Sequence, residues 1–576
     1  MKFLNYYKKP TRVFPLNIWD GLALLLIFGL FAMLAYGARQ MSLPFNLGQP
    51  IHISLDPHVL PGYALQSVLR MLIAMVISLL FTFGFGTLAA KNKHAERLII
   101  PMIDILQSVP VLGFLSITIA GFIALFPGSM MGPECACIFA IFTAQTWNMT
   151  LGFYQSLKSV PEDLQEAAAM FHLTAWQKFW RVEVPLAMPS LIWNMMMSMS
   201  ASWVFLVAAE AISVANQSIT LPGIGSYIAA AVSHKDMAGI LFAIIAMFVV
   251  IFIYDQILFR PLVKWSEKFR FEQNPDDKQT RSWVAIIMER AHLLKLLDLS
   301  KQFIKDMFIN RLFYNRRNLH DIPTVNVSSR RFMIVFWYIA VSAIIIVSTA
   351  YLLHFIFSAL PYSEAWLTFK LGCATLTRVL VSVLISSIIW VPIGVWIGMN
   401  PRLTQTIQPI IQFLAGFPAN LLFPLVVMLI LHFDLNVQIW VTPLMTIGSM
   451  WYILFNVVAG TSTLPKDYFY ATDNFGVKGW LWWKRFILPG VFPYYITGAI
   501  TAAGAAWNLS IIAEVIQWGH TKIVAYGLGA YISEYTTKGD FHRIALSIGM
   551  MCLFVLFFNR LVWKPLYKLA EERYGN

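Results

Sequence analysis

Apolar runs of about twenty residues recur along the whole chain, and they constrain its fold more than any other feature. A helix of that length spans the ~30 Å hydrocarbon core of a membrane. The runs have helix length rather than a short alternating pattern, which favours helices over a β-barrel. Only 12% of the 576 residues are charged, about half of the roughly 25% typical of soluble domains. The chain is therefore predicted to be an all-α polytopic membrane protein.

Twelve membrane spans are predicted, six in each half of the chain. They cover residues 16–36, 63–90, 98–126, 134–154, 186–210, 238–260, 332–357, 367–398, 408–431, 439–458, 490–513 and 541–563. If both termini are cytoplasmic, 34 of the 42 Lys and Arg residues fall in cytoplasmic segments, as the positive-inside rule requires. The net charge of +13 then indicates contact with anionic membrane lipids, and no nucleic-acid partner is expected.

The chain is a tandem repeat. A shift of 304 residues places Trp147 on Trp451 and Pro185 on Pro489, and a shift of 308 places Pro110 on Pro418. Each half holds an even number of spans, so the two halves have the same orientation in the membrane. Parallel repeats imply a pseudo-twofold axis along the membrane normal, with a pathway between the halves. We therefore predict transmembrane domains at residues 1–268 and 332–576.

The segment between these domains, residues 269–331, is the most charged part of the chain. Within it, residues 282–313 place apolar side chains at helical spacing among Lys and Arg. This pattern favours a basic amphipathic helix on the cytoplasmic leaflet, and a loosely ordered linker is the alternative.

Two polar segments, 155–185 and 459–489, interrupt the apolar pattern between the fourth and fifth span of each half. The first begins with Ser159-Val-Pro-Glu162, which fits a capping box with its proline in the first helical turn. The second keeps the cap and the proline, as Thr463-Leu-Pro-Lys466, but lacks the reciprocal Glu.

A turn is predicted after the first helix of each segment, followed by an amphipathic stretch that ends at Pro185 or Pro489. Each segment would then form one short helix that projects from the membrane and a second that lies along its surface. This shape is suited to docking a protein partner.

The segment EAAAMFHL, together with VEVPLAMPSLI downstream, resembles the EAA loop of permease subunits of binding-protein-dependent ABC importers. The flanking sequences SVLRMLIAMVISLLF (67–81), IPMIDILQSVPVLGFL (100–115) and TLTRVLVSVLISSII (375–389) are similar to the nitrate/sulfonate/taurine/bicarbonate branch. The resemblance covers both halves and nearly all of the chain outside 269–331. It implies two tandem six-helix type I ABC importer transmembrane domains, fused in one chain, in the inner (cytoplasmic) membrane of a bacterial cell.

In that family the EAA loop is a coupling helix, seated in a groove of a separate ATPase subunit. The resemblance therefore implies ATPase-coupling roles for Glu166, Ala167, Ala168, His172, Tyr470, Ala471, Asp473 and Gly476. The first loop departs from the family pattern because His172 replaces the usual Gly. The second keeps Gly476 but has Tyr470 in place of the Glu, so we hypothesise that the two docking contacts are unequal.

The resemblance also implies the partners: two copies of an ABC ATPase subunit and a periplasmic or lipid-anchored solute-binding protein. The sequence contains no Gly-x-x-x-x-Gly-Lys-Ser/Thr motif, so the chain itself has no P-loop for ATP. It is therefore predicted to be a transport subunit rather than an enzyme. No cofactor or metal is expected on this chain, and ATP and Mg²⁺ are expected on the partner ATPase.

Ionisable residues in apolar spans are candidates for a transport pathway. Two pairs recur in both halves: Arg70 with Arg378, and Glu210 with Glu514. In one interpretation the Arg and Glu residues pair to fix helix packing, or the Arg side chains reach the outer headgroups. In the other, the two Arg residues give the pathway a positive potential that attracts small anions.

The sequence therefore predicts the translocation pore of an ATP-driven importer that works by alternating access. The favoured solute is a small anion such as nitrate, bicarbonate, taurine or another sulfonate. Importers of an unrelated solute (an amino acid, a vitamin precursor or a cation) stay open. So does a secondary transporter or channel driven by an ion gradient, which would have no need of paired docking loops.

Overall fold

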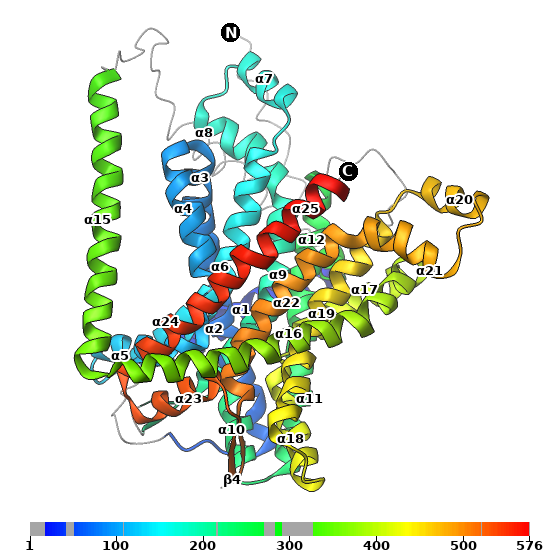
Figure 1. The fold of residues 1–576 in the computed structure, drawn as a ribbon. Helices are drawn as coiled ribbons and strands as arrows, with labels where there is room; N and C mark the ends of the chain where they lie inside the picture. Colours follow the sequence, from blue (N-terminus) through cyan, green and yellow to red (C-terminus); the bar gives the residue numbers. More distant parts are fainter. Residues whose placement is uncertain are drawn as a thin grey trace. The chain divides into compact units, whose positions relative to one another are not determined.

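The protein is described by a computed structural model that covers residues 18–41, 51–107, 109–214, 217–269, 283–290, 327–519 and 521–574. Most of these residues lie in helices (Figure 1). They belong to two compact units, each considered by itself below. The first unit comprises 1–39, 155–193 and 253–322, and the second comprises 40–154, 194–252 and 323–576.

The first half of the chain contains an N-terminal helix and then a series of long and short helices with one hairpin. Its elements are α1 (Ile18–Met41), η1 (Pro57–Val59), α2 (Leu60–Phe81), η2 (Thr82–Gly86), α3 (Thr87–Lys91), α4 (Lys93–Leu106), α5 (Val111–Leu125), α6 (Met131–Lys158), α7 (Glu162–Met170), α8 (Ala175–Lys178), η3 (Phe179–Glu183), α9 (Val184–Glu210), β1 (Ala211–Val214), β2 (Gln217–Thr220), α10 (Ile224–Ser233), α11 (Met237–Tyr254), η4 (Asp255–Phe259), α12 (Arg260–Ser266) and η5 (Glu267–Phe269).

The second half repeats this order. After α13 (Trp283–Arg290), its elements are α15 (Val327–Ala359), α16 (Tyr362–Gly398), α17 (Pro401–Gly416), η7 (Ala419–Leu421), α18 (Phe423–His432), α19 (Val437–Ser462), α20 (Lys466–Asn474), α21 (Gly479–Trp482), η8 (Trp483–Ile487), α22 (Leu488–Ala513), β3 (Val515–Trp518), β4 (Thr521–Val524), α23 (Leu528–Lys538), α24 (Phe541–Phe558), η9 (Asn559–Trp563) and α25 (Lys564–Tyr574). From α7 to β2, most elements recur 304 residues later with identical length. The repeat seen in the sequence is therefore also a repeat of local structure.

Eight described helices are long and apolar enough to cross a membrane: 57–91, 175–210, 237–269, 339–359, 362–398, 437–462, 479–513 and 541–570. The predicted span 98–126 corresponds to a ninth, bent candidate. The remaining three predicted spans coincide with helices that do not meet the same test, namely α1, α6 and the pair α17 and α18. The chain is thus a multi-pass helical membrane protein, while the number of twelve spans and the cytoplasmic location of both termini stay predictions.

The third span of each half is broken rather than continuous, contrary to the sequence prediction. Helices α4 and α5 meet at an angle of 88°, and Pro110 stands at the N-terminus of α5. At the equivalent place in the second half, Pro418 precedes η7, which separates α17 from α18. Proline has no N–H to donate to the preceding turn and disfavours helical geometry in the residue before it, so each helix ends there.

The fold is not purely helical, because a two-stranded antiparallel hairpin follows the fifth span of each half. In the first, Ala211 pairs with Thr220, and in the second Val515 pairs with Val524. The register is the same after a shift of 304 residues. These short strands are too small to produce a strand pattern in the sequence.

Within the first unit, α13 lies beside α12 and carries Val284 and Ile287 on its buried face. The guanidinium of Arg290 lies 5.2 Å from the centre of the Trp19 ring on α1. This helix is the described part of the predicted amphipathic segment 282–313. The rest of that segment lies outside the described residues.

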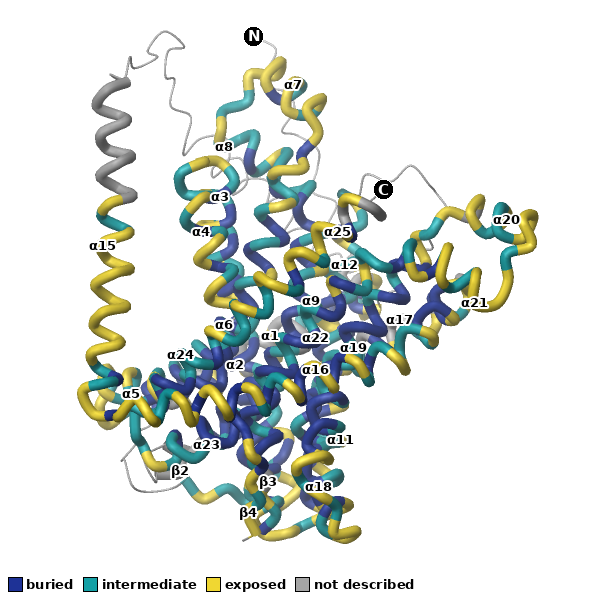
Figure 2. The backbone as a smooth tube through the Cα atoms, in the orientation of Figure 1, coloured by how far each residue is buried: buried dark blue, intermediate teal, exposed yellow. Residues whose placement is uncertain are grey.

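Within the second unit, α19 packs against α16 and α22. Two glycines spaced by four residues allow α16 to approach closely. A β-carbon at Gly394 would lie 2.8 Å from Val457, and one at Gly398 would lie 2.6 Å from Thr461. Such small-xxx-small spacing is common where membrane helices pack tightly. In contrast, α15 is exposed from Ser342 to His354 (Figure 2), as expected of a lipid-facing helix, and Ile356 near its end is buried.

The turns after α7 and α20 have the same left-handed backbone. His172 has φ of 51° and Gly476 has φ of 65°. A residue with a β-carbon is strained in this region, whereas glycine is not. The first turn therefore carries backbone strain that the second avoids.

We expect Gly476→Ala to destabilise the turn after α20 by about 1 kcal/mol, because no atom within 4 Å would contact the added methyl and only the backbone conformation resists it. Trypsin cleavage at the neighbouring Lys478 should then become roughly fivefold faster. Conversely, His172→Gly should slow cleavage at Lys178. Gly504→Ala, at an open helical position on α22, is the control; equal cleavage of all four proteins would contradict the assignment of strain.

Candidate functional site

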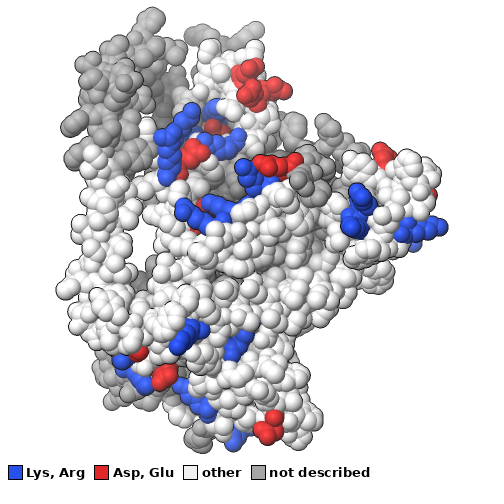
Figure 3. Space-filling view, viewed as in Figure 1, with Lys and Arg blue, Asp and Glu red and all other residues white. Residues whose placement is uncertain are grey.

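The helix α7 is a short helix between two loops, and it carries acidic residues in its first helical turn. Glu162 and Asp163 lie there, and acidic side chains gather on this helix in Figure 3. Negative charge near a helix N-terminus is favourable. The predicted capping box is wrong, because Pro161 itself is the N-cap and the hydroxyl of Ser159 donates to the Ser156 carbonyl instead.

The predicted cap of α20 is wrong for the same reason. Pro465 is the N-cap, and the hydroxyl of Thr463 donates to the Gly460 carbonyl. A capping box does occur nearby, at the start of α8, where Thr174 and Gln177 bond reciprocally. It orients the helix that follows the turn.

Three of the four predicted coupling residues on the first loop are accessible. Glu166 and His172 are exposed and Ala167 is half-buried, whereas Ala168 is buried. The helix ends in two apolar side chains, Met170 and Phe171, which are 80% and 79% exposed. Sequence reasoning did not single out this pair.

All four predicted coupling residues on the second loop are accessible. Tyr470, Asp473 and Gly476 are exposed, and Ala471 is half-buried. Phe475, which corresponds to Phe171, is 83% exposed. Large exposed apolar side chains among polar ones are typical of a protein-binding surface.

The helix after each projecting segment does not end at Pro185 or Pro489, contrary to the sequence prediction. Instead, one helix runs from Ala175 to Glu210 and another from Gly479 to Ala513. A π-helical turn precedes each proline, at η3 and η8. This wider turn is a known cause of helix bending and lets the helix continue past a residue that has no N–H.

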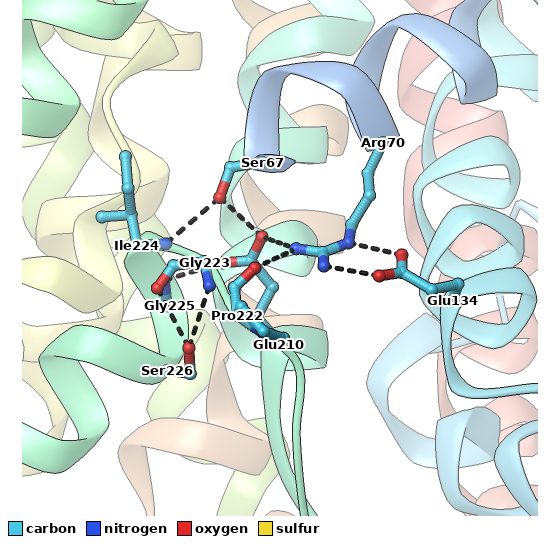
Figure 4. Close-up of polar contacts among 9 residues, drawn as sticks. All are labelled: Ser67, Arg70, Glu134, Glu210, Pro222, Gly223, Ile224, Gly225 and Ser226. Carbon is cyan, nitrogen blue, oxygen red and sulfur yellow. Dashed lines mark hydrogen bonds and ion pairs between the residues drawn. The ribbon is translucent and has the colours of Figure 1, made fainter. Parts of the chain in front are cut away.

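A buried ion cluster joins α2, α6 and the end of α9 (Figure 4). The guanidinium of Arg70 forms two bonds to Glu134, Nε to Oε2 at 2.6 Å and Nη2 to Oε1 at 2.7 Å. Its Nη1 donates to Glu210 Oε1 at 2.7 Å and to the Pro222 carbonyl at 2.9 Å. All three ionisable side chains are almost fully buried. A charge buried this deeply requires such partners.

The second half contains a matching cluster with one difference. Arg378 Nη1 donates to Glu514 Oε1 at 2.8 Å and to the Tyr526 carbonyl at 2.9 Å. Its Nη2 donates to the amide oxygen of Gln438 at 2.7 Å. Gln438 occupies the position of Glu134, so the first cluster has two carboxylates for one cation and the second has one.

Each Glu also holds the segment that follows its hairpin. The Gly225 N–H donates to Glu210 Oε2 at 2.7 Å, and the Ala530 N–H donates to Glu514 Oε2 at 3.1 Å. A β-carbon at Gly223 or Gly527 would lie 2.3 Å from the carboxylate. Glycine is therefore required for this close approach, and α10 and α23 are fixed to the ends of α9 and α22.

This geometry favours the packing interpretation of the four candidate pathway residues Arg70, Arg378, Glu210 and Glu514. Each guanidinium is buried and bonded to a carboxylate, so neither presents an isolated positive charge. The sequence reasoning missed Glu134. An available signal was that Glu134 falls on Gln438 under the same 304-residue shift as Glu210 and Glu514.

A cavity of about 390 Å³ lies next to these clusters in the second unit, between segments of the two halves. Ala211 and Gly225 line it from the first half, and Asn420 and Thr536 from the second. Its size falls within the range of small-molecule sites.

We expect Arg70→Met to destabilise the protein more than Arg378→Met. The first substitution leaves two buried carboxylates without a cation and the second leaves one, and breaking a buried pair costs about 3–5 kcal/mol. The midpoint of thermal unfolding in detergent measures the difference. Glu134→Gln should be mild, because it reproduces the Arg378–Gln438 arrangement; equal midpoints for the two Arg variants would contradict this account.

Comparison with known proteins agrees with this architecture. The family model for the binding-protein-dependent transport system inner membrane component matches residues 82–260 and 390–563. The bicarbonate transport permease CmpB of Synechococcus elongatus is 28% identical over 164 residues, which are 28% of this chain and 58% of that protein. The nitrate import permease NrtB of Leptolyngbya laminosa is 26% identical over 189 residues, 33% of this chain and 64% of that protein.

A third relative, the glycine betaine/carnitine permease GbuB of Listeria monocytogenes, is 29% identical over 194 residues, 33% of this chain and 63% of that protein. The chain thus spans about six-tenths of the length of the curated relatives that it matches. The family model covers more than half of the chain, once in each half, in the same regions that the structure repeats. The chain therefore belongs to the family of inner-membrane components of binding-protein-dependent transport systems and is a multi-pass permease with two tandem copies of the family domain.

Proposed function

We propose that this chain forms the translocation pore of an ATP-driven importer and moves a small solute across the cytoplasmic membrane by alternating access. The observation that carries the proposal is the pair of projecting helices, α7 and α20, at identical positions of the repeat. Each ends in an exposed phenylalanine, Phe171 or Phe475. Two equivalent docking points on one chain suit a partner that is itself a dimer.

The partner that suits these helices is a pair of ABC ATPase subunits, which would bind ATP and Mg²⁺. This chain has no P-loop sequence of its own. The family is that of binding-protein-dependent systems, so a periplasmic or lipid-anchored binding protein would deliver the solute. Membrane lipids, anionic ones above all, would surround the bundle.

Movement of a docked ATPase would reach the pore through a short connection. In the second half, the turn at Gly476 leads directly into the helix 479–513, which ends beside Glu514. A displacement of α20 would thus act on one end of a continuous helix whose other end lies at the cavity. Helix shifts of this kind switch a pathway between two states.

The two docking contacts are proposed to be unequal. Glu166 adds a third acidic side chain to α7, whereas Tyr470, at the same position on α20, has a phenol in place of the carboxylate. An exposed carboxylate can accept charged hydrogen bonds that the phenol cannot.

The solute is proposed to be a small anion, since curated relatives carry the names of bicarbonate and nitrate permeases. Another relative is named for glycine betaine and carnitine, so a zwitterionic quaternary amine is the competing solute.

A transporter driven by an ion gradient is the second candidate, and the ion clusters argue against it. Such a protein needs carboxyl groups in its spans that can exchange protons or cations. Glu134, Glu210 and Glu514 are each bonded to an arginine instead.

We expect Phe171→Ala and Phe475→Ala each to weaken binding of the ATPase roughly tenfold, because each removes an apolar anchor from the tip of a docking helix. Co-purification with the ATPase tests whether the complex forms, and titration of the ATPase onto the purified permease measures the dissociation constant. Phe433→Ala, at a similarly exposed aromatic residue after α18, should have no effect; ATP-independent uptake at the full rate by the purified chain would contradict the proposed function.

The unequal contacts make a separate prediction. Glu166→Ala should reduce transport-coupled ATP hydrolysis several-fold more than Tyr470→Ala, because only the first removes a charge from the docking surface. The difference should shrink at high salt, where charge pairs are screened. Equal losses at low salt would remove the case for asymmetry.

A further inference from the structure

The cavity between the two halves is chemically one-sided. Applying the repeat shifts to its lining, Leu112 corresponds to Asn420, Ala229 to Ser533, and Val232 to Thr536. In these three pairs the first half presents an aliphatic side chain and the second half presents a polar one, whereas a fourth pair, Ser233 and Thr537, is polar in both halves. Two further polar residues, Gln517 and Lys522, come from the β3–β4 hairpin of the second half.

Two polar atoms on the second-half wall lack partners among the described residues. They are Thr536 Oγ1 and Asn420 Oδ1, and both are shielded from solvent. The Thr536 side chain is more than nine-tenths buried. Because a buried polar atom normally has a hydrogen-bond partner, this wall is suited to a polar ligand.

The positive charge of Lys522 on the second-half wall favours an anionic ligand. Lys522 is the single formally charged residue among those that line the cavity, and it forms no ion pair with the described part of the chain. A lysine ammonium attracts an anion, while the Thr536 hydroxyl and the second Nδ2 hydrogen of Asn420, the one not donated to the Val204 carbonyl, can donate hydrogen bonds to its oxygens.

A quaternary ammonium group would fit this lining poorly. Such groups are bound over the faces of several aromatic rings, whereas Phe423 is the only aromatic residue among the described residues that line the cavity. The ammonium of Lys522 would also repel the ligand cation.

We infer that this cavity is a binding site for a small oxyanion, and that the second half supplies its recognition wall through Lys522, Thr536 and Asn420. The inference rests on the proposed transport function and narrows its solute class. The first half supplies a mainly aliphatic wall, with Ser233 as the one polar side chain from the described part of that half, and this wall confines the anion against the second-half side chains. The duplicated halves thus perform different tasks at one site.

Two side-chain hydrogen bonds between the halves near the cavity have the same one-sidedness. Asn508 Oδ1 accepts a bond from the Val111 N–H at 2.9 Å, and Asn420 Nδ2 donates to the Val204 carbonyl at 3.3 Å. In both, a second-half side chain bonds to first-half backbone. The second bond holds Asn420 at the edge of the cavity, and its Oδ1, an acceptor, has no partner in the described ranges of the chain.

The test is uptake of ¹⁵N-nitrate, ¹⁴C-bicarbonate and ¹⁴C-taurine, with ¹⁴C-glycine betaine for comparison, by cells that express this chain together with its ATPase and binding protein. Lys522→Gln and Thr536→Val should each raise the half-saturation concentration for the transported anion at least fivefold. Lys522→Arg should retain most of the affinity. ATP hydrolysis stimulated by the solute-free binding protein should be unchanged in all three variants, which shows that folding and coupling survive.

Lys538→Gln is the matched control. This lysine is on α23, pairs with Glu534 and does not line the cavity, so its variant should transport like the wild type. If Lys522→Gln and Thr536→Val also transport like the wild type, the inferred site is wrong. Import of glycine betaine and of none of the three anions would overturn the anion site but leave ATP-driven import standing, whereas solute uptake that does not depend on ATP would overturn both.

Discussion

Two buried carboxylates, those of Glu210 and Glu514, hold three segments of each half together: the second span, the end of the fifth span and the segment that follows the hairpin. Each accepts a bond from an arginine on the second span of its half and from an N–H just beyond its own hairpin. An unpaired carboxylate at such a depth would be far costlier than a paired one, so the arginine, the glycine-containing turn and the helix end are held together. Val207 and Gly225, which line the cavity, pack against one another because the Glu210 cluster brings α10 onto the last turns of α9. The shape of the cavity therefore depends on the clusters.

Because the domain is duplicated, the two halves have the same order of secondary-structure elements but different side chains at equivalent positions. The hairpins have the same register, and π-helical turns occur at equivalent positions. Against this constant background, Glu134 becomes Gln438 in the clusters, and Val232 becomes Thr536 at the cavity. Each change alters charge or hydrogen bonding at a position that the backbone already fixes. A pore built from two identical subunits could not have one polar and one apolar wall, because a twofold axis would repeat every substitution. Fusion of the halves in one chain removes that restriction.

Much of the architecture could be predicted from the sequence, because its causes are local or periodic. Helix-length apolar runs predicted the eight described helices that are long and apolar enough to cross a membrane, and the shift of 304 residues predicted the repeat that the structure displays. The errors have identifiable reasons. Pro161 was placed inside a helix that it actually caps, since a proline suits either position. Pro185 was expected to end a helix, but the helix continues past it through a π-helical turn. The amino-acid composition does not indicate where such a turn forms. Pro110 was used only to align the repeat and was not recognised as the start of a new helix, α5, inside the predicted span. Glu134 and the cavity were missed because they depend on tertiary contacts between residues far apart in the chain.

The position of the cavity relative to the helix 479–513 has a mechanical consequence. This helix has 35 residues, which corresponds to about 50 Å at 1.5 Å per residue. Its first turn follows the docking helix α20, and its last turns supply Ile511 and Ile512 to the cavity wall. The π-helical turn at η8 has a weaker hydrogen-bonding pattern than the α-helix around it, so it is the place where bending costs least. If an ATPase binds α20 as proposed, its pull would be divided between bending at η8 and displacement at Ile511. The Glu514–Arg378 pair would resist displacement at that far end, so in the proposed mechanism the ion cluster sets how much of the pull opens the cavity and how much only bends the helix.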